Sequence, residues 1–313
     1  MTRFVVPTNI PELMFPMLCE DKALKLIEIF IACDDFANAY QRWKAQYHPN
    51  QKPGPDSQLA PSEVMTILIF YHYSGAKCFQ YYYRDWVQGP LRAYFPCQVS
   101  YERFVSELAQ VGGLLFLLLK YQCAQSERTG FYIADSKALA VCDNHRIKTN
   151  QVFAGIAARG KSSMGWFYGL KAHLVINQYG QLVNFVLTPG NVADNNGPLL
   201  RSLLTDLQGQ CFGDRGYLTR LFAEFYQNGL QIVTKLRRGM KDTLIPLSDK
   251  LNLRKRGLIE SVNDLLTSVF DIEHTRHRNP LNALVNVVAG LSAYCFADRK
   301  PSIVVPEFKR INP

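Results

Sequence analysis

Two aspartates lie beside short apolar segments, where an ionised side chain is costly to bury. Asp135 lies within the segment Phe-Tyr-Ile-Ala-Asp-Ser, and Asp214 follows Gln-Cys-Phe-Gly. A buried carboxylate needs compensation, which a bound cation, a network of N–H donors or a salt bridge can supply. Each aspartate alone fits a structural role as well as a functional one. As a pair at corresponding positions of neighbouring strands, they favour one shared functional site.

A third carboxylate is expected on a helix that packs across the ends of these strands. Residues 257–270 show the apolar spacing of a helix, and Glu260 lies on the adjacent acidic stripe. The residues that precede it, Arg254, Lys255 and Arg256, are basic and suit a site that handles phosphate. Glu273 is the rival third carboxylate, but it comes later in the chain, and we prefer Glu260.

Three carboxylates at one place can hold divalent metal ions. Two such ions about 4 Å apart can activate an attacking oxygen and stabilise a leaving oxygen at phosphorus. Hard oxygen ligands fit Mg²⁺ or Mn²⁺ and leave positions open for water and phosphate. The sequence therefore predicts Asp135, Asp214 and Glu260 as both the metal ligands and the catalytic residues.

Basic residues surround the predicted acids in the sequence, and the chain carries a formal net charge of +9. A solvated surface is the simplest explanation of any such run, but two runs flanking the acids favour a channel for DNA. The residues predicted to contact DNA are Arg146, Lys148, Arg159, Lys161, Lys171, Arg215, Arg237, Arg238, Arg254, Lys255, Arg256, Arg276 and Arg278.

The elements that must position these residues change character along the chain. Residues 1–125 are predicted to form a mostly helical domain, in which the aromatic segment 79–86 more plausibly packs helices together than stacks on bases. Residues 126–313 are predicted to form an α/β domain with a mixed sheet. The predicted strands are 131–136, 166–177, 181–188, 210–212 and 230–235, and the helices between them are 199–207 and 219–228. This order is that of an RNase H-like fold, although element order alone does not prove it.

Composition excludes several other classes of protein. The eight cysteines include no CxxC pair, and a zinc site at His274 and His277 is disfavoured by their Arg-rich surroundings. The N-terminus has no secretory apolar region, and the apolar run 114–119 is too short to cross a bilayer. We therefore expect a cytoplasmic protein that does not enter a membrane.

Several of these motifs, taken as a set, resemble a known family. They are Ile-Ala-Asp-Ser at Asp135, residues 159–173, residues 188–194, Gly-Asp-Arg-Gly-Tyr at Asp214, Arg256-x-x-x-Glu260, and residues 272–278. Together they look like a bacterial insertion-sequence transposase of the IS982 family. The resemblance covers most of the chain and is firmer after residue 130. It implies a DDE triad, DNA transposition, binding to double-stranded element ends and target DNA, association with the nucleoid, and a homodimer on DNA.

One position departs from the pattern of related transposases. They usually carry a basic residue seven positions after the catalytic glutamate, and this chain has Thr267 there. Two alternatives therefore stay open: an RNase H-fold nuclease without strand transfer, and a DNA-binding protein with weakened catalysis. The intact acidic trio argues against the second alternative.

Overall fold

The computed structural model describes residues 4–5, 18–49, 57–162, 165–234, 247–273 and 277–305. The chain divides into two compact units. We call Met1–Leu119, Val269–Ile272 and Leu281–Phe296 the helical unit, and Lys120–Ser268, Glu273–Pro280 and Ala297–Pro313 the sheet unit. These units are interleaved along the sequence, whereas the sequence pattern predicts two contiguous domains that meet at residue 125.

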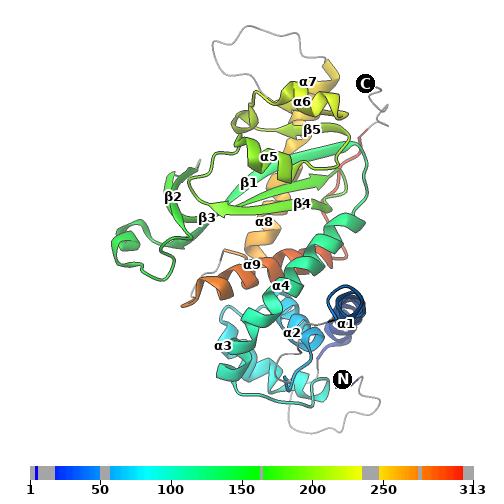
Figure 1. The fold of residues 1–313 in the computed structure, drawn as a ribbon, viewed down its shortest axis with the longest axis vertical. Helices are drawn as coiled ribbons and strands as arrows, with labels where there is room; N and C mark the ends of the chain where they lie inside the picture. Colours follow the sequence, from blue (N-terminus) through cyan, green and yellow to red (C-terminus); the bar gives the residue numbers. More distant parts are fainter. Residues whose placement is uncertain are drawn as a thin grey trace. The chain divides into compact units, whose positions relative to one another are not determined.

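Helices build the helical unit (Figure 1). Pro61 is the first residue of one of them, and the Ser100 hydroxyl accepts a hydrogen bond from the Arg103 N–H at the start of another. The elements are α1 (Glu20–Tyr47), α2 (Pro61–Ser74), α3 (Phe79–Tyr82), η1 (Tyr83–Val87), η2 (Pro90–Ala93), most of α4 (Tyr101–Gln125) and α9 (Pro280–Cys295). Phe79 and Tyr83 pack against Phe104, so these two aromatic residues of the segment 79–86 contribute to the packing of the helices.

The last helix, α9, completes the core of the helical unit. The Tyr73 hydroxyl donates a hydrogen bond of 2.7 Å to the Ala293 carbonyl. A Cβ atom on Gly112 of α4 would lie 2.7 Å from the Val285 side chain. Because these contacts join residues far apart in sequence, α1 to α4 depend on α9 for a closed core.

One helix, α4, is long and apolar enough to span a membrane by length and composition alone. Its residues Phe104, Leu115 and Leu119 are fully buried in the fold. The side chain of Lys120 donates to Asn184 and to the Phe185 carbonyl within the sheet unit. These contacts are those of a core helix.

A six-stranded sheet is the centre of the sheet unit. Its strands are β1 (Phe131–Cys142), β2 (Ala158–Ser162), β3 (Gly165–Asn177), β4 (Leu182–Pro189), β5 (Gly209–Gly213) and β6 (Leu230–Thr234). The order is β2-β3-β1-β5-β6, with β4 also paired to β3. β3 is antiparallel to β1, β2 and β4, while β5 is parallel to β1 and β6. This mixed sheet confirms the predicted fold class, and β2 is a strand that the sequence pattern did not predict.

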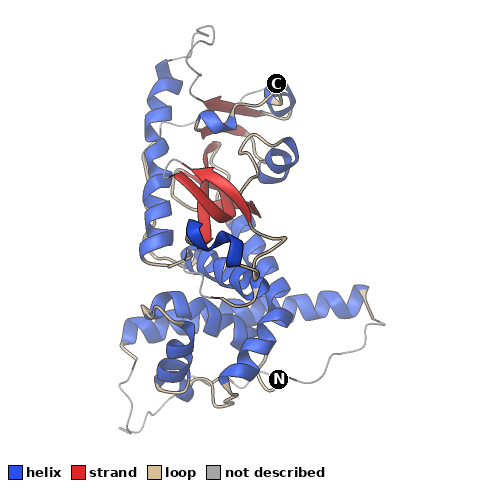
Figure 2. Ribbon diagram, turned by 90° about the vertical axis from the view of Figure 1, so that its left-hand side faces the viewer, coloured by secondary structure: helices blue, strands red, loops and turns tan. Residues whose placement is uncertain are grey.

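Helices lie on both faces of the sheet (Figure 2). One face of the sheet is covered by α5 (Gly197–Leu203) and α6 (Phe222–Gln227). Along the opposite face lie α7 (Leu247–Arg254), η5 (Lys255–Gly257) and α8 (Leu258–Ser268). Tyr132 and Ala134 of β1 belong to the apolar cluster that contains Leu200 and Phe225 of α5 and α6. Because alternate residues of a strand face opposite sides, Ile133 and Asp135 face α8.

Candidate active site

Asp135 lies where β1 passes beneath α8. The Asn263 side chain on α8 donates a hydrogen bond of 3.1 Å to Asp135 Oδ2. Only 22% of the Asp135 side chain is exposed. The carboxylate is therefore largely desolvated. The Asn263 side chain and the nearby Arg256 guanidinium compensate only part of its negative charge.

Asp214 comes directly after β5, the strand that pairs with β1. β1 and β5 pair up to Ile133 and Phe212, and each aspartate comes two residues after its paired residue. The Asp214 Oδ1 atom accepts a hydrogen bond of 2.7 Å from the Gly216 N–H and caps the short helix η4 (Arg215–Tyr217). The structure therefore confirms that β1 and β5 are neighbouring strands, and both aspartates lie beyond the same end of their paired segment.

The electrostatics of Asp135 show how closely the acids are grouped. The pKa of Asp135 is raised to about 6, mainly by burial. The Arg256 guanidinium and a backbone hydrogen bond at Ser136 act to lower this pKa, and the negative charges of Asp214 and Asp194 act to raise it. Burial also raises the pKa of Tyr217, and the negative charges of Asp135, Asp194 and Asp214 raise it further. The Tyr217 hydroxyl has no hydrogen-bond partner among the described residues. A cation bound beside Asp135 would lower the pKa of that carboxyl group.

Glu260 is connected to Asp135 by the side chain of Arg256, which contacts both carboxylates. The Arg256 guanidinium lies 3.6 Å from Glu260 Oε1 and 3.8 Å from Asp135 Oδ1, so it bridges the two carboxylates. The Glu260 side chain is 68% exposed, in contrast to that of Asp135. Among the described residues, no group of three or more histidine, cysteine or acidic side chains is already arranged to hold a metal ion.

The rival carboxylate, Glu273, has a partner of its own. Lys137 on β1 lies 2.6 Å from Glu273 Oε1, and the Lys137 side chain is only 14% exposed. Lys137 lies two residues after Asp135 on β1, and its ammonium group neutralises the Glu273 carboxylate. Glu273 is therefore a member of an ion pair beside the acidic site.

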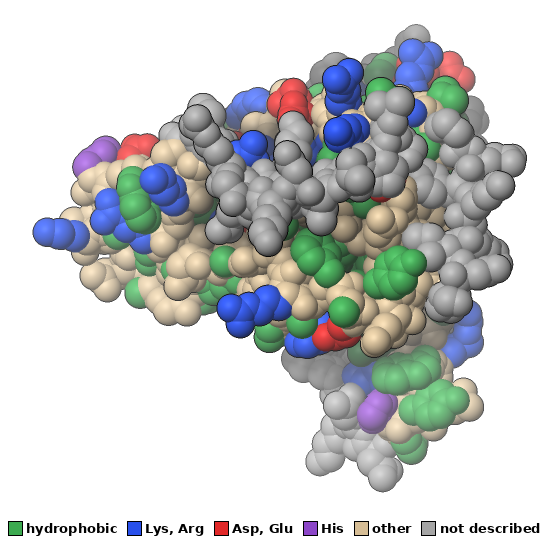
Figure 3. Space-filling model, turned by 90° about the horizontal axis from the view of Figure 1, so that it is seen from above, with side chains coloured by type: hydrophobic (Ala, Val, Ile, Leu, Met, Phe, Trp, Pro, Cys, Tyr) green, Lys and Arg blue, Asp and Glu red, His purple; other side chains and the backbone are tan. Residues whose placement is uncertain are grey.

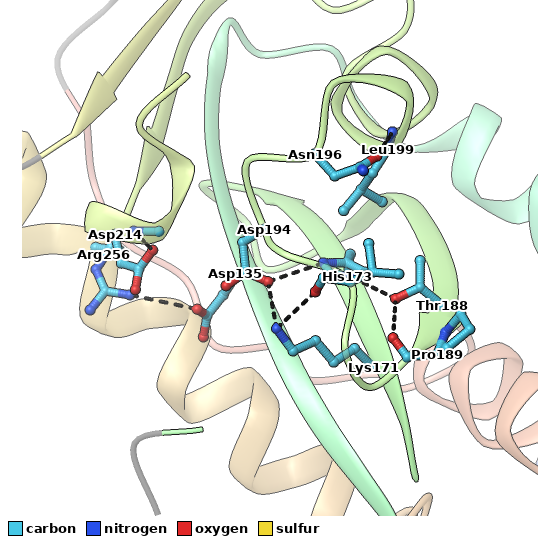
Figure 4. A network of polar contacts seen from close by, with 12 residues as sticks. Asp135, Lys171, His173, Thr188, Pro189, Asp194, Asn196, Leu199, Asp214 and Arg256 are labelled. Carbon is cyan, nitrogen blue, oxygen red and sulfur yellow. Dashed lines mark hydrogen bonds and ion pairs between the residues drawn. The ribbon is translucent and has the colours of Figure 1, made fainter. Parts of the chain in front are cut away.

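Asp194 is an acid of this site that sequence reasoning did not select. A Cβ atom on Gly216 would lie 2.8 Å from Asp214 Oδ1 and 3.1 Å from Asp194 Oδ2, so these two carboxylates are close together. Lys171 Nζ binds Asp194 Oδ1 at 3.2 Å and the Val192 carbonyl at 3.1 Å (Figure 4). The Lys171 side chain is 11% exposed, so it belongs to this network and not to the open surface where we expected a DNA contact.

His173 supports the same network without carrying a charge. Its Nδ1 atom is 3.6 Å from Asp194, and its Nε2 atom is hydrogen-bonded to Thr188 at 2.9 Å. Burial lowers the pKa of His173 to about 4, so the imidazole is neutral at neutral pH. Lys171 is therefore the cation that balances Asp194. The only sequence signal for Asp194 was its place in the segment 188–194, which we noted for its family resemblance alone.

Most of the described cations that we predicted to contact DNA lie on the surface of the sheet unit. Arg146, Lys148, Arg159, Lys161, Arg215, Arg254 and Arg278 are exposed. Lys255 is half-buried and donates to the Val304 carbonyl. Lys and Arg side chains gather at the left-hand end and along the upper edge of the view in Figure 3. Arg237, Arg238, Arg276 and His274 lie outside the described residues.

The residues of this site lie within a match to a known protein family. Residues 125–280 match the family described as transposase DDE domain. The chain carries a transposase DDE domain. No curated protein matches the chain. The matched residues contain all three predicted catalytic acids: Asp135 on β1, Asp214 directly after β5, and Glu260 on α8.

The family match indicates the general class of reaction that the chain catalyses. A transposase DDE domain is a phosphoryl-transfer enzyme that acts on DNA inside the cell, and such enzymes generally use divalent metal ions. The predicted enzyme class and the predicted mixed-sheet fold are therefore confirmed. The DDE match supports transposition-type cleavage and transfer of DNA strands as the activity of this class.

Proposed function

We propose that this DDE domain cleaves DNA at the ends of an insertion sequence and joins those ends to a target, with Asp135, Asp214 and Glu260 as its metal-binding triad. The observation that carries the proposal is the parallel pairing of β1 and β5, because Asp135 and Asp214 each come two residues after the last paired residues, Ile133 and Phe212. The Arg256 bridge from Asp135 to Glu260 supports the choice of the third acid.

The donor set fits divalent ions of the hard class, Mg²⁺ or Mn²⁺. Carboxylate oxygens suit these ions, and the raised pKa of the buried Asp135, close to Asp214 and Asp194, is one that a bound cation would lower. Two bound ions would activate the attacking oxygen and stabilise the leaving oxygen in an in-line displacement. Asp135 and Asp214 would hold the ions from the strands, and Glu260 would close the set from α8.

Other residues of the chain position this triad and the substrate. Asn263 orients Asp135 through its hydrogen bond, and Arg256 holds Glu260 beside it. Lys171 and His173 fix Asp194 next to Asp214. The exposed cations around the acids bind DNA phosphates, which fits the net charge of +9. We assign the helical unit to the binding of element ends.

The finer identity of the element follows from the sequence resemblance. We propose an insertion sequence of the IS982 family, a homodimer that holds two double-stranded ends, and association with the nucleoid. A dimer is expected because transposition must bring two ends together.

The triad is tested by isosteric replacement. Asp135→Asn, Asp214→Asn and Glu260→Gln should each reduce Mg²⁺-dependent cleavage by at least about 100-fold, because each removes a charged ligand at nearly constant volume. Duplex binding in the presence of EDTA should stay within about twofold. Glu273→Gln is the matched control and should retain most of its activity.

The same assay separates transposition from simple nuclease action. A substrate with element ends and a supercoiled target plasmid should yield joined products as well as nicks. Nicking without joined products would support the nuclease alternative. Near-normal cleavage by one of the three acid variants would remove that residue from the triad.

A further inference from the structure

An exposed indole lies between two cations at the edge of the sheet unit. Trp166, near the start of β3, is 55% exposed. The Arg159 guanidinium lies 5.3 Å and the Lys161 ammonium 5.8 Å from its ring centre. Lys161 pairs with Trp166 across β2 and β3, and Arg159 is two residues away, so all three side chains lie on one face of the ribbon.

This cluster borders a cavity that reaches the acidic site. The cavity has a volume of about 400 Å³ and is lined by Arg159, Lys161, Trp166, Lys171, Asp194 and Gly216, among others. Its size lies within the usual range of small-ligand sites, about 300–1,000 Å³. Gly216 and Asp194 also adjoin Asp214, so a group bound in this cavity would lie beside the proposed triad.

Close contact between two backbone segments builds the wall of this cavity. A Cβ atom on Gly160 would lie 2.2 Å from the Gly190 carbonyl oxygen, and a Cβ on Gly190 would lie 2.6 Å from the Ala158 oxygen. Only glycine permits such an approach. The strand β2 is thereby held against the loop that carries Asp194, and the cavity between them is formed before any ligand binds.

We propose that this cavity receives a single unpaired nucleotide of the DNA substrate, with its base stacked on Trp166 and its phosphate bound by Arg159 and Lys161. An aromatic face with flanking cations is the arrangement that binds single-stranded nucleic acid without sequence preference. Bases within a duplex already stack on both faces, so only an unstacked base can use the indole. This inference rests on the proposed function and adds an unpaired-strand site to it.

Affinity for two related probes tests the inference. The probes are a short duplex with a single-stranded thymidine overhang and the same duplex with blunt ends, both in EDTA so that neither is cut. Trp166→Ala should weaken binding of the overhang probe by about 5- to 100-fold, the effect of losing one base–aromatic stack, and leave the blunt probe within about twofold. Trp166→Phe should retain most of the overhang affinity.

Tyr226→Ala is the matched control, because Tyr226 is an aromatic residue of the sheet unit that is 51% exposed on α6 and does not line the cavity. It should not change the preference for the overhang. A second readout is intrinsic fluorescence: the overhang probe should quench the parent protein more strongly than the blunt probe, and Trp166→Phe should abolish the difference. This readout does not depend on the stability of the alanine variant.

The outcomes separate the two proposals. Failure of the parent protein to bind either probe would contradict the proposed DNA function itself. Equal reductions in affinity for both probes in Trp166→Ala would make Trp166 part of a general duplex surface and overturn the unpaired-nucleotide site. Unchanged affinity for the overhang would overturn it as well, and would leave Trp166 free to serve as a protein contact.

Discussion

Arg256 is the cation shared by two members of the proposed triad. It contacts both Asp135 and Glu260, whereas the Thr267 hydroxyl donates to the Asn263 carbonyl of its own helix at 2.8 Å. Thr267 therefore has its hydroxyl engaged one turn back along α8. The positive charge that related transposases place on a residue seven positions after the glutamate is supplied here, we propose, by Arg256.

Substitutions at these two positions should differ sharply. Arg256→Ala should lower cleavage and joining by about 100-fold or more, because it removes a preorganised positive charge beside the reacting phosphate. Thr267→Lys should change both rates by less than about threefold. Both are measured with Mg²⁺ and a substrate bearing element ends. A strong gain of joined product in Thr267→Lys, with little effect of Arg256→Ala, would reverse the assignment.

The buried charge of Asp135 should also appear in the stability of the metal-free protein. A folded-state pKa of about 6, above the unfolded value of 3.8, means that ionising Asp135 opposes folding. Its unfavourable contribution is absent at low pH, grows between about pH 4 and 6, and is complete above pH 6. Asp135→Asn should therefore raise the free energy of unfolding at pH 7 by up to about 3 kcal/mol.

Urea denaturation in EDTA measures this effect at two pH values. The gain from Asp135→Asn should fall below about 1 kcal/mol near pH 4 and vanish near pH 3, where Asp135 is neutral in both the folded and the unfolded parent. A gain of equal size at both pH values would mean that the substitution acts through packing or through Asn263, and not through the carboxylate charge.

Single residues also mark how far the sequence was informative. Asp135 and Asp214 could be found because an acid beside an apolar run is conspicuous. Asp194 was not selected, because it follows β4 in a polar loop and its neighbours in the sequence do not predict burial. Lys171 resembled a surface cation for the converse reason: only the fold shows that Asp194 and Val192 enclose its ammonium group.

At the scale of elements, helices and strands with a strong apolar periodicity were predicted well from the sequence, whereas a polar edge strand was not predicted. The apolar repeats of β3, β4 and α8 gave elements close to those observed. β2 was missed because its sequence, Ala-Arg-Gly-Lys-Ser, is polar and contains glycine, which is rare in strands. Its pairing with β3 and the close approach of Gly160 to Gly190 hold it in the sheet, and neither is visible in a local pattern.

Adjacent glycines in α4 offer a test of how this helix packs. A Cβ on Gly113 would meet no atom within 4 Å, whereas a Cβ on Gly112 would lie 2.7 Å from Val285. Gly113→Ala should raise the free energy of unfolding by about 0.5–1 kcal/mol through helix propensity. Gly112→Ala should lower it by about 1–3 kcal/mol, because α9 must shift. Thermal or urea unfolding measures both, and equal gains would show that α9 does not pack closely there.

At the scale of the whole molecule, the excess of positive charge should govern DNA affinity. Arg146, Lys148 and Arg254 are exposed cations of the sheet unit. Changing all three to Gln should weaken binding to any duplex and lower the slope of log affinity against log salt by about one unit for each phosphate that is no longer neutralised. Arg201→Gln is the control, because Arg201 is exposed but paired with Glu224 at 2.7 Å.

Filter binding over a range of salt concentrations gives this slope directly. An unchanged slope in the triple variant would show that these three side chains are a solvated surface. A slope change in Arg201→Gln as large as that of the triple variant would show that DNA follows a different face of the sheet unit.

The interleaving of the two units has a consequence for how the protein is made. The helical unit begins at the N-terminus, yet it needs α9, which ends at Cys295 of a 313-residue chain. Val285, Leu291 and Tyr294 of that helix are almost completely buried. During synthesis, α1 to α4 therefore have an incomplete core until α9 has been translated. A chain cut short before α9 would have no complete helical unit, even with every residue of α1 to α4 present.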